Sequence, residues 1–305
     1  MRLMVVGGAG FLGSHLVDRL LAEQHAVDVV DDLSSGSLAN LADARALGGE
    51  LKIHHLDAGA PELDALVALR EPEVLVHLAS LLPGVPASLG RSVPVLLNVL
   101  EAARHHGVGK VVCAVPAGAL YGDVPARDLP VKEGRLGDGG GLTGSAGTVE
   151  GVVARALADL LAVYRQRHAL EFTALAMTEV YGPRQRADGG IVGRLAVALA
   201  AGEVPEVPGD GRQARDFLYV DDAVDALVRA TRRGSGLVVN VGTGQLTSVR
   251  DVWTMLAGPA AGALRHVPAQ EGDEVARLSV SPTRARIHLA WAPWTTLDVG
   301  LRTLR

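Results

Sequence analysis

The sequence predicts an α/β fold, in which a doubly wound parallel sheet carries a smaller, interleaved C-terminal lobe. Short apolar runs alternate with longer segments of helical periodicity, a pattern typical of parallel strands joined by crossover helices. After about residue 176 this alternation loosens and prolines punctuate shorter elements, which predicts the smaller lobe. The apolar runs predicted to be strands are residues 3–6, 26–31, 51–56, 73–78, 110–115, 170–176 and 237–241.

The helices between these strands are predicted from apolar residues that recur every three or four positions, and each such stripe is expected to pack on the sheet. We predict a dinucleotide-binding domain over residues 1–176 and a substrate lobe over residues 177–305, with the strand at 237–241 returning to the main sheet. The three clearest helical stripes are Leu16, Val17, Leu20 and Leu21; Leu63, Leu66, Val67 and Leu69; and Leu96, Leu97, Leu100 and Ala103.

The composition points to a globular protein that acts on a small molecule. The chain has 305 residues, 48% of them hydrophobic, and a formal net charge of -5 provides no basic field for nucleic acid or an anionic membrane. Neither is therefore expected as a partner. The single cysteine, Cys113, excludes an internal disulfide and a cysteine-rich zinc site, and no metal site is predicted.

Export and membrane insertion are not expected. Met1 leads directly into the first strand, which leaves no room for a secretory signal, and no apolar run approaches the ~20 residues that span a bilayer. We therefore expect a cytoplasmic protein. The sequence leaves the oligomeric state open.

A glycine-rich turn follows the first strand. Residues 7–13 read Gly-Gly-Ala-Gly-Phe-Leu-Gly and lead into an amphipathic helix. Gly7 permits the tight turn, Gly10 lets backbone approach a pyrophosphate, and Gly13 allows close helix packing. The second strand ends in Asp31, about 20 residues further on, where a carboxylate can accept hydrogen bonds from an adenosine ribose. This spacing predicts a Rossmann fold that binds a dinucleotide.

The acidic end of the second strand bears on the choice between NAD(H) and NADP(H). Asp31 and Asp32 would repel a 2′-phosphate, so NAD(H) is favoured as the cofactor. NADP(H) stays possible, because Ser34, Ser35 and Arg45 could accommodate the phosphate.

Further motifs occur along the chain in the order in which one family carries them. They lie at residues 7–16, 31–36, 77–80, 180–183, 209–212, 215–222, 240–244 and 289–291. With these motifs the chain resembles the extended short-chain dehydrogenase/reductases, in the branch of the NAD-dependent nucleotide-sugar epimerases and dehydratases.

The resemblance implies two further sets of contact residues. In addition to the glycines and the two aspartates, the cofactor is expected to contact Phe11, Leu12, Asp57, Ala58, Leu78, Ala79, Ser80 and Thr178. The substrate is expected to contact Leu142, Glu179, Tyr181 and Arg215.

The residues with which that family transfers protons are missing. The resemblance implies a hydroxyl residue at Ala117, a tyrosine at Leu142 and a lysine at Ala146, and none of these side chains can transfer a proton. Tyr164 and His168 have the tyrosine–lysine spacing but lie a helix length too late. We therefore predict no catalytic residue.

Three functions are compatible with this pattern, in the following order. The first is an atypical NAD(P)H-dependent ketoreductase of antibiotic biosynthesis, which reduces a ketone of a polycyclic aromatic polyketide with a proton from the substrate or from water. The second is a catalytically inactive dinucleotide-binding sensor or scaffold. The third is a nucleotide-sugar epimerase or dehydratase, which the missing residues disfavour. The glycine-rich segment 133–147 is predicted to form a lid over the substrate.

Overall fold

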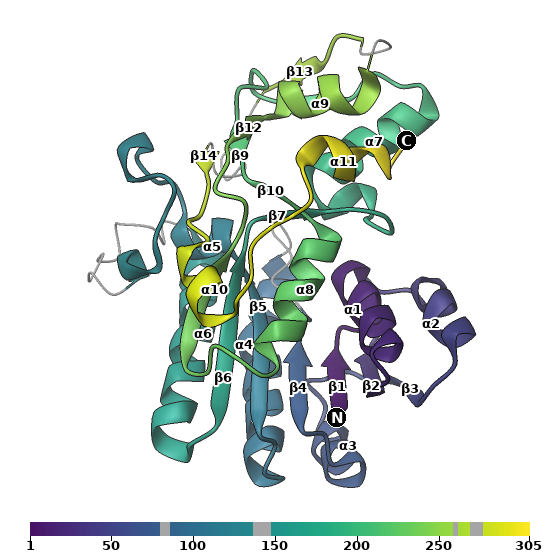
Figure 1. The fold of residues 1–305 in the computed structure, drawn as a ribbon, viewed down its shortest axis with the longest axis vertical. Helices are drawn as coiled ribbons and strands as arrows, with labels where there is room; N and C mark the ends of the chain where they lie inside the picture. The colour runs from purple at the N-terminus through teal and green to yellow at the C-terminus, as the bar shows by residue number, and fades with distance from the viewer. Residues whose placement is uncertain (80–85, 137–147, 259–261, 269–276) are drawn as a thin grey trace.

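The computed structural model describes residues 1–79, 86–136, 148–258, 262–268 and 277–305. Its largest sheet consists of β1 (Arg2–Val6), β2 (Ala26–Asp31), β3 (Leu51–His55), β4 (Val74–His77), β5 (Lys110–Pro116), β6 (Glu171–Met177) and β11 (Leu237–Val241). These seven strands lie in the order β11-β6-β5-β4-β1-β2-β3, and every neighbouring pair is parallel. The predicted α/β fold with a doubly wound parallel sheet is therefore confirmed (Figure 1).

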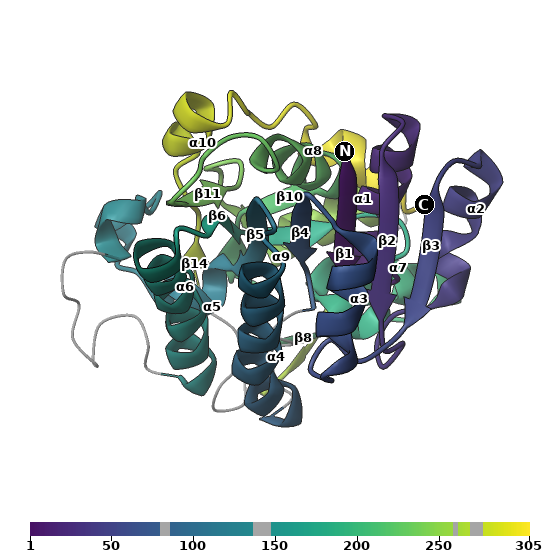
Figure 2. The ribbon, with the colours of Figure 1, turned by 90° about the horizontal axis from the view of Figure 1, so that it is seen from below.

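Helices cover both faces of this sheet, as Figure 2 shows. On one face lie α3 (Glu62–Arg70), α4 (Pro86–His105) and α6 (Val149–His168), and on the other lie α1 (Phe11–Ala22) and α8 (Val220–Ala230). Strand β1 alternates between the two cores, since Leu3 and Val5 face the core of α1 and α8, whereas Met4 and Val6 face that of α3, α4 and α6. Burial on both faces explains why the strand is a continuous apolar run.

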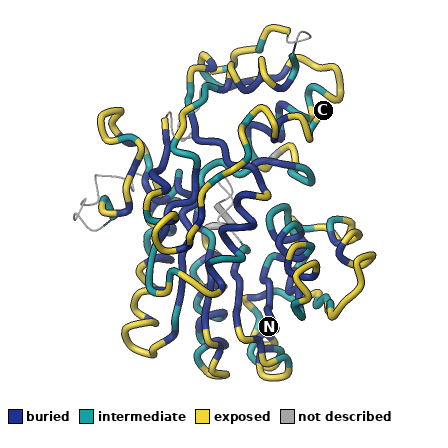
Figure 3. The backbone as a smooth tube through the Cα atoms, in the orientation of Figure 1, coloured by how far each residue is buried: buried dark blue, intermediate teal, exposed yellow. Residues whose placement is uncertain are grey.

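One predicted helical contact is wrong. Leu63 and Val67 of α3 are fully buried against the sheet, but Leu69, which was expected to join them, is 75% exposed. Two residues along an α-helix rotate the side chain by about 200°, so Leu69 points to the side opposite Val67. Figure 3 shows the general pattern, with burial concentrated in the strands and on the helix faces that meet them.

The other described elements are short, and most of those after residue 177 lie beyond the carboxyl ends of the main strands (Figure 1). The helices are α2 (Ala42–Leu47), α5 (Ala117–Tyr121), α7 (Ile191–Ala201), α9 (Val249–Ala257), α10 (Thr283–His288) and α11 (Leu297–Arg302). The 3-10 helices are η1 (Leu38–Leu41), η2 (Ala126–Asp128), η3 (Glu133–Leu136) and η4 (Ala187–Gly189). The strands pair as β7 (Glu179–Tyr181) with β10 (Phe217–Tyr219), β8 (Glu206–Pro208) with β13 (Arg265–Val267), and β9 (Ala214–Arg215) with both β12 (Thr247–Ser248) and β14 (Arg277–Leu278).

We call the short elements after residue 177 that lie beyond the carboxyl ends of the main strands the smaller part. Strand β11 lies at the edge of the main sheet beside β6, although the short strands of the smaller part that precede β11 in sequence come after β6. The boundary between the two lobes at residues 176 and 177 stays a prediction. Among the helices that the structure describes, none combines the length and the apolar character needed to cross a membrane.

Candidate functional site

The glycine-rich turn between β1 and α1 brings three backbone segments together. Gly7 has a φ of +83°, and its N–H donates to Val30 O at 2.8 Å. A Cβ on Gly7 would lie 2.8 Å from the backbone nitrogen of Ala79, and one on Gly13 would lie 2.1 Å from Gly7 O. Side chains at these two positions would therefore collide with backbone, which is the reason for glycine at both.

The amino end of α1 begins at the same turn. Gly10 is the N-cap residue and makes no side-chain cap, and the first intrahelical bond runs from Ser14 N to Gly10 O at 3.0 Å. The first turn of α1, all of which the structure describes, holds no acidic residue. The helix dipole and the N–H groups of residues 11–13 therefore suit a phosphate group.

The carboxylate of Asp31 ties the end of β2 to this turn. It accepts hydrogen bonds from Ala9 N at 2.8 Å and from Leu33 N at 2.9 Å, and the residue is 8% exposed. Each carboxylate oxygen keeps a second lone pair for a ribose hydroxyl. Asp31 orders the loop that follows β2, and its contact with a ribose stays a prediction.

The turn after β4 forms the opposite side of the glycine turn. Leu78 N donates to Val6 O at 2.8 Å, and Ala79 is the residue that a Cβ on Gly7 would strike. The next predicted cofactor residue, Ser80, lies outside the described residues. Leu78 and Ala79 therefore lie at the point where the strand order reverses, between β1 and β4, which is where open α/β sheets bind ligands.

Beyond β2, the end of β3 supplies Asp57 and Ala58. The Asp57 carboxylate accepts from Gly59 N at 2.8 Å and forms an ion pair with Arg91 of α4. Ala58 is 7% exposed, and its carbonyl accepts from Asn98 of α4 at 2.7 Å. Helix α4 thus holds the loop after β3 through two side chains.

Asp32 forms a second carboxylate of this region. It accepts from Ser34 N at 2.9 Å and from Ser34 Oγ at 2.6 Å, and its Oδ2 lies 3.7 Å from Nη1 of Arg91. Burial raises the pKa of Asp32, but the hydrogen bonds from Ser34 and the charge of Arg91 outweigh it, so that its pKa is lower than usual.

The carboxyl end of β6 leads into the predicted substrate residues. Thr178 directly follows β6, and its N–H donates to Val241 O of β11 at 3.1 Å. Glu179 begins β7, and its Oε1 lies 3.2 Å from Nη1 of Arg215, which is 6% exposed. The structure therefore brings Glu179 and Arg215 together as an ion pair, in which a carboxylate compensates the buried guanidinium.

A buried carboxylate fixes the position of Arg215. The neighbouring Asp216 is 1% exposed and accepts hydrogen bonds from Thr243 N, Thr243 Oγ1 and Gly244 N at 2.8, 2.6 and 2.8 Å. Burial raises the pKa of Asp216, although these hydrogen bonds oppose the shift. Asp216 thereby joins β9 and β10 to the loop after β11.

The four tyrosines all lie in the described part of the chain, and each hydroxyl donates a hydrogen bond within the protein. The acceptors are Asn240 Oδ1 for Tyr121 at 2.6 Å, Glu101 Oε1 for Tyr164, Leu297 O for Tyr181 at 3.3 Å and Thr303 Oγ1 for Tyr219 at 3.4 Å. Tyr181 is 1% exposed, so its contact with substrate stays a prediction that burial does not favour. Burial raises the pKa of Tyr164 to about 12.

The position at which the resemblance implies a hydroxyl residue holds Ala117, which is buried at the start of α5. Leu142 and Ala146 lie outside the described residues, as does most of the segment predicted to be a lid. At the start of that segment, residues 133–136 form η3, and the buried Glu133 accepts from Asn240 N at 2.9 Å. Glu133 thus joins η3 to β11, and the lid itself stays a prediction.

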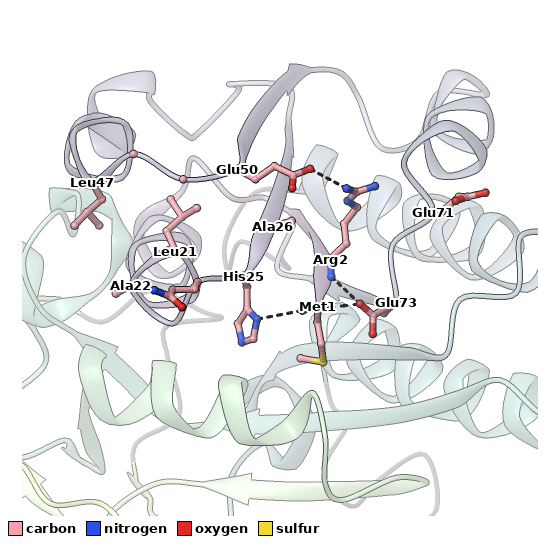
Figure 4. A pocket seen from close by; sticks show the side chains of 13 residues that line it. Met1, Arg2, Leu21, Ala22, His25, Ala26, Leu47, Glu50, Glu71 and Glu73 are labelled. Carbon is pink, nitrogen blue, oxygen red and sulfur yellow. Dashed lines mark hydrogen bonds and ion pairs between the residues drawn. The ribbon is translucent and has the colours of Figure 1, made fainter.

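A surface hollow of about 790 Å³ lies at the opposite, amino-terminal edge of the sheet (Figure 4). Its walls carry an ion pair of 2.8 Å between Arg2 and Glu50, and His25 Nδ1 lies 3.4 Å from the amino group of Met1. The hollow is therefore separate from the glycine turn, which lies at the other end of β1. Across the ranges that the structure describes, no group of three or more His, Cys, Asp or Glu residues is placed to hold a metal ion.

Comparison with known proteins identifies the relatives of this chain. Residues 3–242 match the model of the NAD dependent epimerase/dehydratase family. A UDP-glucose 4-epimerase of Mycolicibacterium smegmatis is 39% identical over 322 residues, covering 99% of this chain and 96% of that protein. The crystal structure of the UDP-glucose 4-epimerase of Thermotoga maritima with UDP-glucose has a TM-score of 0.89 at 29% identity, covering 100% of this chain and 97% of that chain. The UDP-glucose 4-epimerase of Thermus thermophilus in complex with NAD has a TM-score of 0.86 at 28% identity, covering 100% and 99%.

These relatives overturn the first predicted function. The chain matches UDP-sugar epimerases along nearly its whole length, and other relatives are UDP-sugar decarboxylases, so the prediction of a polyketide ketoreductase of antibiotic biosynthesis is wrong. That prediction depended on the missing proton-transfer residues, which bear on the rate of a reaction more than on its substrate. The third predicted function, an enzyme of nucleotide sugars, fits better.

Sequence reasoning missed two residues of α4 at this edge. Asn98 is a polar residue in an otherwise apolar stripe, which is a signal that could have identified it. Arg91 is separated from Asp32 and Asp57 by dozens of residues and has no local signal.

Proposed function

The chain belongs to the NAD-dependent epimerase/dehydratase family, and we propose that it binds NAD(H) at the carboxyl edge of the main sheet and acts on a UDP-sugar, with 4-epimerisation as its reaction. The similarity to the UDP-glucose 4-epimerase of M. smegmatis along almost the whole chain carries this proposal. The extent of the match includes both the glycine turn and the smaller part of the structure.

The described residues fit the dinucleotide. The close backbone approach at Gly7 and Gly13 requires glycine in the turn before α1, whose amino end would bind a pyrophosphate, and the Asp31 carboxylate would accept from the adenosine ribose. NAD, when bound, supplies the acceptor and donor of hydride. The side chains of this chain would bind and orient the two ligands.

Arg215 is the cation that we expect to face the sugar nucleotide. Arg215 is held by Glu179 and by the anchoring of Asp216, and a diphosphate would have to compete with the Glu179 carboxylate for its guanidinium. We therefore expect weak binding of the UDP group, and we expect Glu179→Gln to tighten it.

Proton transfer at the sugar hydroxyl lacks a protein group at the positions where the family carries one. Ala117 is apolar, and the four tyrosine hydroxyls are engaged elsewhere. A general acid–base residue contributes about 10²–10⁴ to a rate, so turnover with solvent as proton carrier should be slower by that factor.

The lack of a proton-transfer group at these positions favours a second candidate function. In it, the protein binds NAD(H) and a UDP-sugar without turnover and acts as a sensor or scaffold. Binding and turnover distinguish the two candidates. Calorimetry would measure the binding of UDP-glucose in the presence of NAD⁺, and proton NMR over hours would measure its conversion to UDP-galactose.

A designed pair of variants sharpens the test. Leu142→Tyr/Ala146→Lys places the two family groups back at their expected positions, whereas Leu142→Phe/Ala146→Met is a control of similar size without a proton-transfer group. We expect faster epimerisation only for the first variant. Binding of UDP-glucose by the wild type without conversion would support the sensor or scaffold. Absence of UDP-glucose binding by the wild type would contradict both candidate functions.

A further inference from the structure

Arg91 lies between two carboxylates at the adenosine end of the expected dinucleotide site. It comes from α4, one turn into the helix, and reaches Asp57 after β3 and Asp32 after β2. Its side chain is 53% exposed, and those of Asp32 and Asp57 are 32% and 45% exposed. The three charges therefore form a bridge at the surface, directly beside the buried Asp31.

The location of this bridge follows from the sheet order. β2 and β3 are the last two strands on one side of the point where the strand order reverses. A dinucleotide whose pyrophosphate lies on the amino end of α1 and whose ribose lies at Asp31 extends its adenosine half toward β3. The ribose 2′-oxygen would then lie beside Asp32, whose Oδ2 is 3.7 Å from Arg91 Nη1.

The charges of the bridge bear directly on a 2′-phosphate. Arg91 is the cation that the structure places between Asp32 and Asp57, and both ion pairs use its guanidinium. A 2′-phosphate would have to displace at least one carboxylate from Arg91, and it would meet the charge of Asp31 as well. A ribose with a free 2′-hydroxyl meets neither obstacle.

We propose that Arg91 is a specificity-determining residue for the cofactor, and that its ion pairs with Asp32 and Asp57 keep the site selective for NAD(H) over NADP(H). The inference rests on the proposed binding of a dinucleotide at this edge. In its ion-paired state Arg91 is unavailable to a phosphate. Removal of one carboxylate partner makes its guanidinium available as a ligand of a 2′-phosphate.

The test measures the ratio of the dissociation constant of NADPH to that of NADH, by fluorescence titration of the full chain. Asp57→Asn keeps the shape and the acceptor for Gly59 N but removes the charge, and we expect the ratio to fall about tenfold, which is the value of one weak charged contact. Arg91→Ala should raise the ratio above that of the wild type, because Asp32 and Asp57 lose the cation that compensates their charge and then repel a 2′-phosphate more strongly. The double variant Arg91→Ala/Asp57→Asn should not show the fall in the ratio that Asp57→Asn shows alone, because that fall depends on the guanidinium of Arg91.

Two further arginines serve as controls. Arg155 forms an exposed ion pair with Asp159 on α6, at 3.3 Å, and Arg155→Ala should leave the ratio unchanged. Arg186 is a second cation near this loop, since its Nη1 donates to Ser35 O at 3.2 Å. If Arg186→Ala, and not Arg91→Ala, abolishes the gain of Asp57→Asn, the assignment to Arg91 is overturned.

The outcomes separate the inference from the proposed function. NADH binding by the wild type, combined with a ratio that changes less than about twofold in Arg91→Ala and Asp57→Asn, overturns the inference alone. Absence of NADH binding by the folded wild type overturns both. Because the three side chains of the bridge are partly exposed, the variants should fold, and circular dichroism checks this for each.

Discussion

The close packing of the glycine turn leads to a quantitative prediction for Gly13→Ala. The new Cβ would lie 2.1 Å from Gly7 O and 2.7 Å from Gly8 Cα, whereas real Cβ atoms essentially never approach other heavy atoms more closely than 3.0 Å. The obstacle is backbone, which cannot move aside as a flexible side chain does. Helix α1 or the turn must therefore shift.

The magnitude follows from two opposing terms. Overpacking of this kind costs about 1–3 kcal/mol, whereas alanine in place of glycine within a helix gains about 1 kcal/mol. We expect a net loss of up to about 2 kcal/mol, which for a chain of this size lowers Tm by up to about 4 °C. NADH affinity should fall by at least about tenfold, because the shift displaces the N–H groups that face the pyrophosphate.

The matched control is Gly90→Ala in α4, where a new Cβ meets no heavy atom of the described residues within 4 Å. This substitution should leave stability unchanged or raise it by up to about 1 kcal/mol. Differential scanning fluorimetry measures Tm, and fluorescence titration measures NADH binding. The reasoning would be refuted if Gly13→Ala matched Gly90→Ala in both measurements.

Three further predictions concern single side chains. Asp31→Ala should weaken NADH binding more than NADPH binding in fluorescence titrations, and should also lower Tm, because the N–H groups of Ala9 and Leu33 lose their acceptor. Tyr121→Phe leaves buried Asn240 Oδ1 without its donor and should cost about 1–3 kcal/mol in urea denaturation, while turnover changes less than about tenfold. Burial lowers the pKa of His77 from 6.5 to about 4, so the unfolded chain binds a proton as pH falls through 6.5 and the native protein does so only near pH 4. On account of His77, the free energy of unfolding should fall by about 3 kcal/mol between pH 6.5 and 4. His77→Gln should show a shallower fall in urea denaturation across that range.

The main sheet could be predicted because its strands are buried on both faces. All residues of 3–6 are buried, and such strands are continuous apolar runs that stand out from their surroundings. The paired strands of the smaller part, such as β7 and β9, have two or three residues each, which is too short for any periodicity. Their positions depend on contacts such as those of Asp216, which join segments far apart in sequence.

Some residues of the candidate site could be predicted from local sequence, and others could not. Gly7, Gly10, Gly13 and Asp31 are recognisable by spacing, because a strand, a tight turn and a helix place them locally. The bridge of Arg91 and the pair of Glu179 with Arg215 arise only when distant elements meet, so no local pattern carries them. The same holds for the hydroxyl of Tyr121, whose acceptor is 119 residues away.

The wrong prediction of function has a physical lesson. The residues that bind cofactor and substrate set the free energy of binding, whereas a residue that transfers a proton lowers the activation free energy of the reaction. The two contributions are separate, because the proton-transfer group acts only on the reacting oxygen in the transition state. Loss of the hydroxyl residue at Ala117 therefore lowers the expected rate without changing the shape of the dinucleotide site or the pair of Glu179 and Arg215. The missing groups argue for slow or absent turnover, and the substrate class has to be inferred from the binding residues and the relatives. It follows that restoring proton transfer at Leu142 and Ala146 should change the rate far more than the affinity for a UDP-sugar, and equal changes in both would contradict this separation.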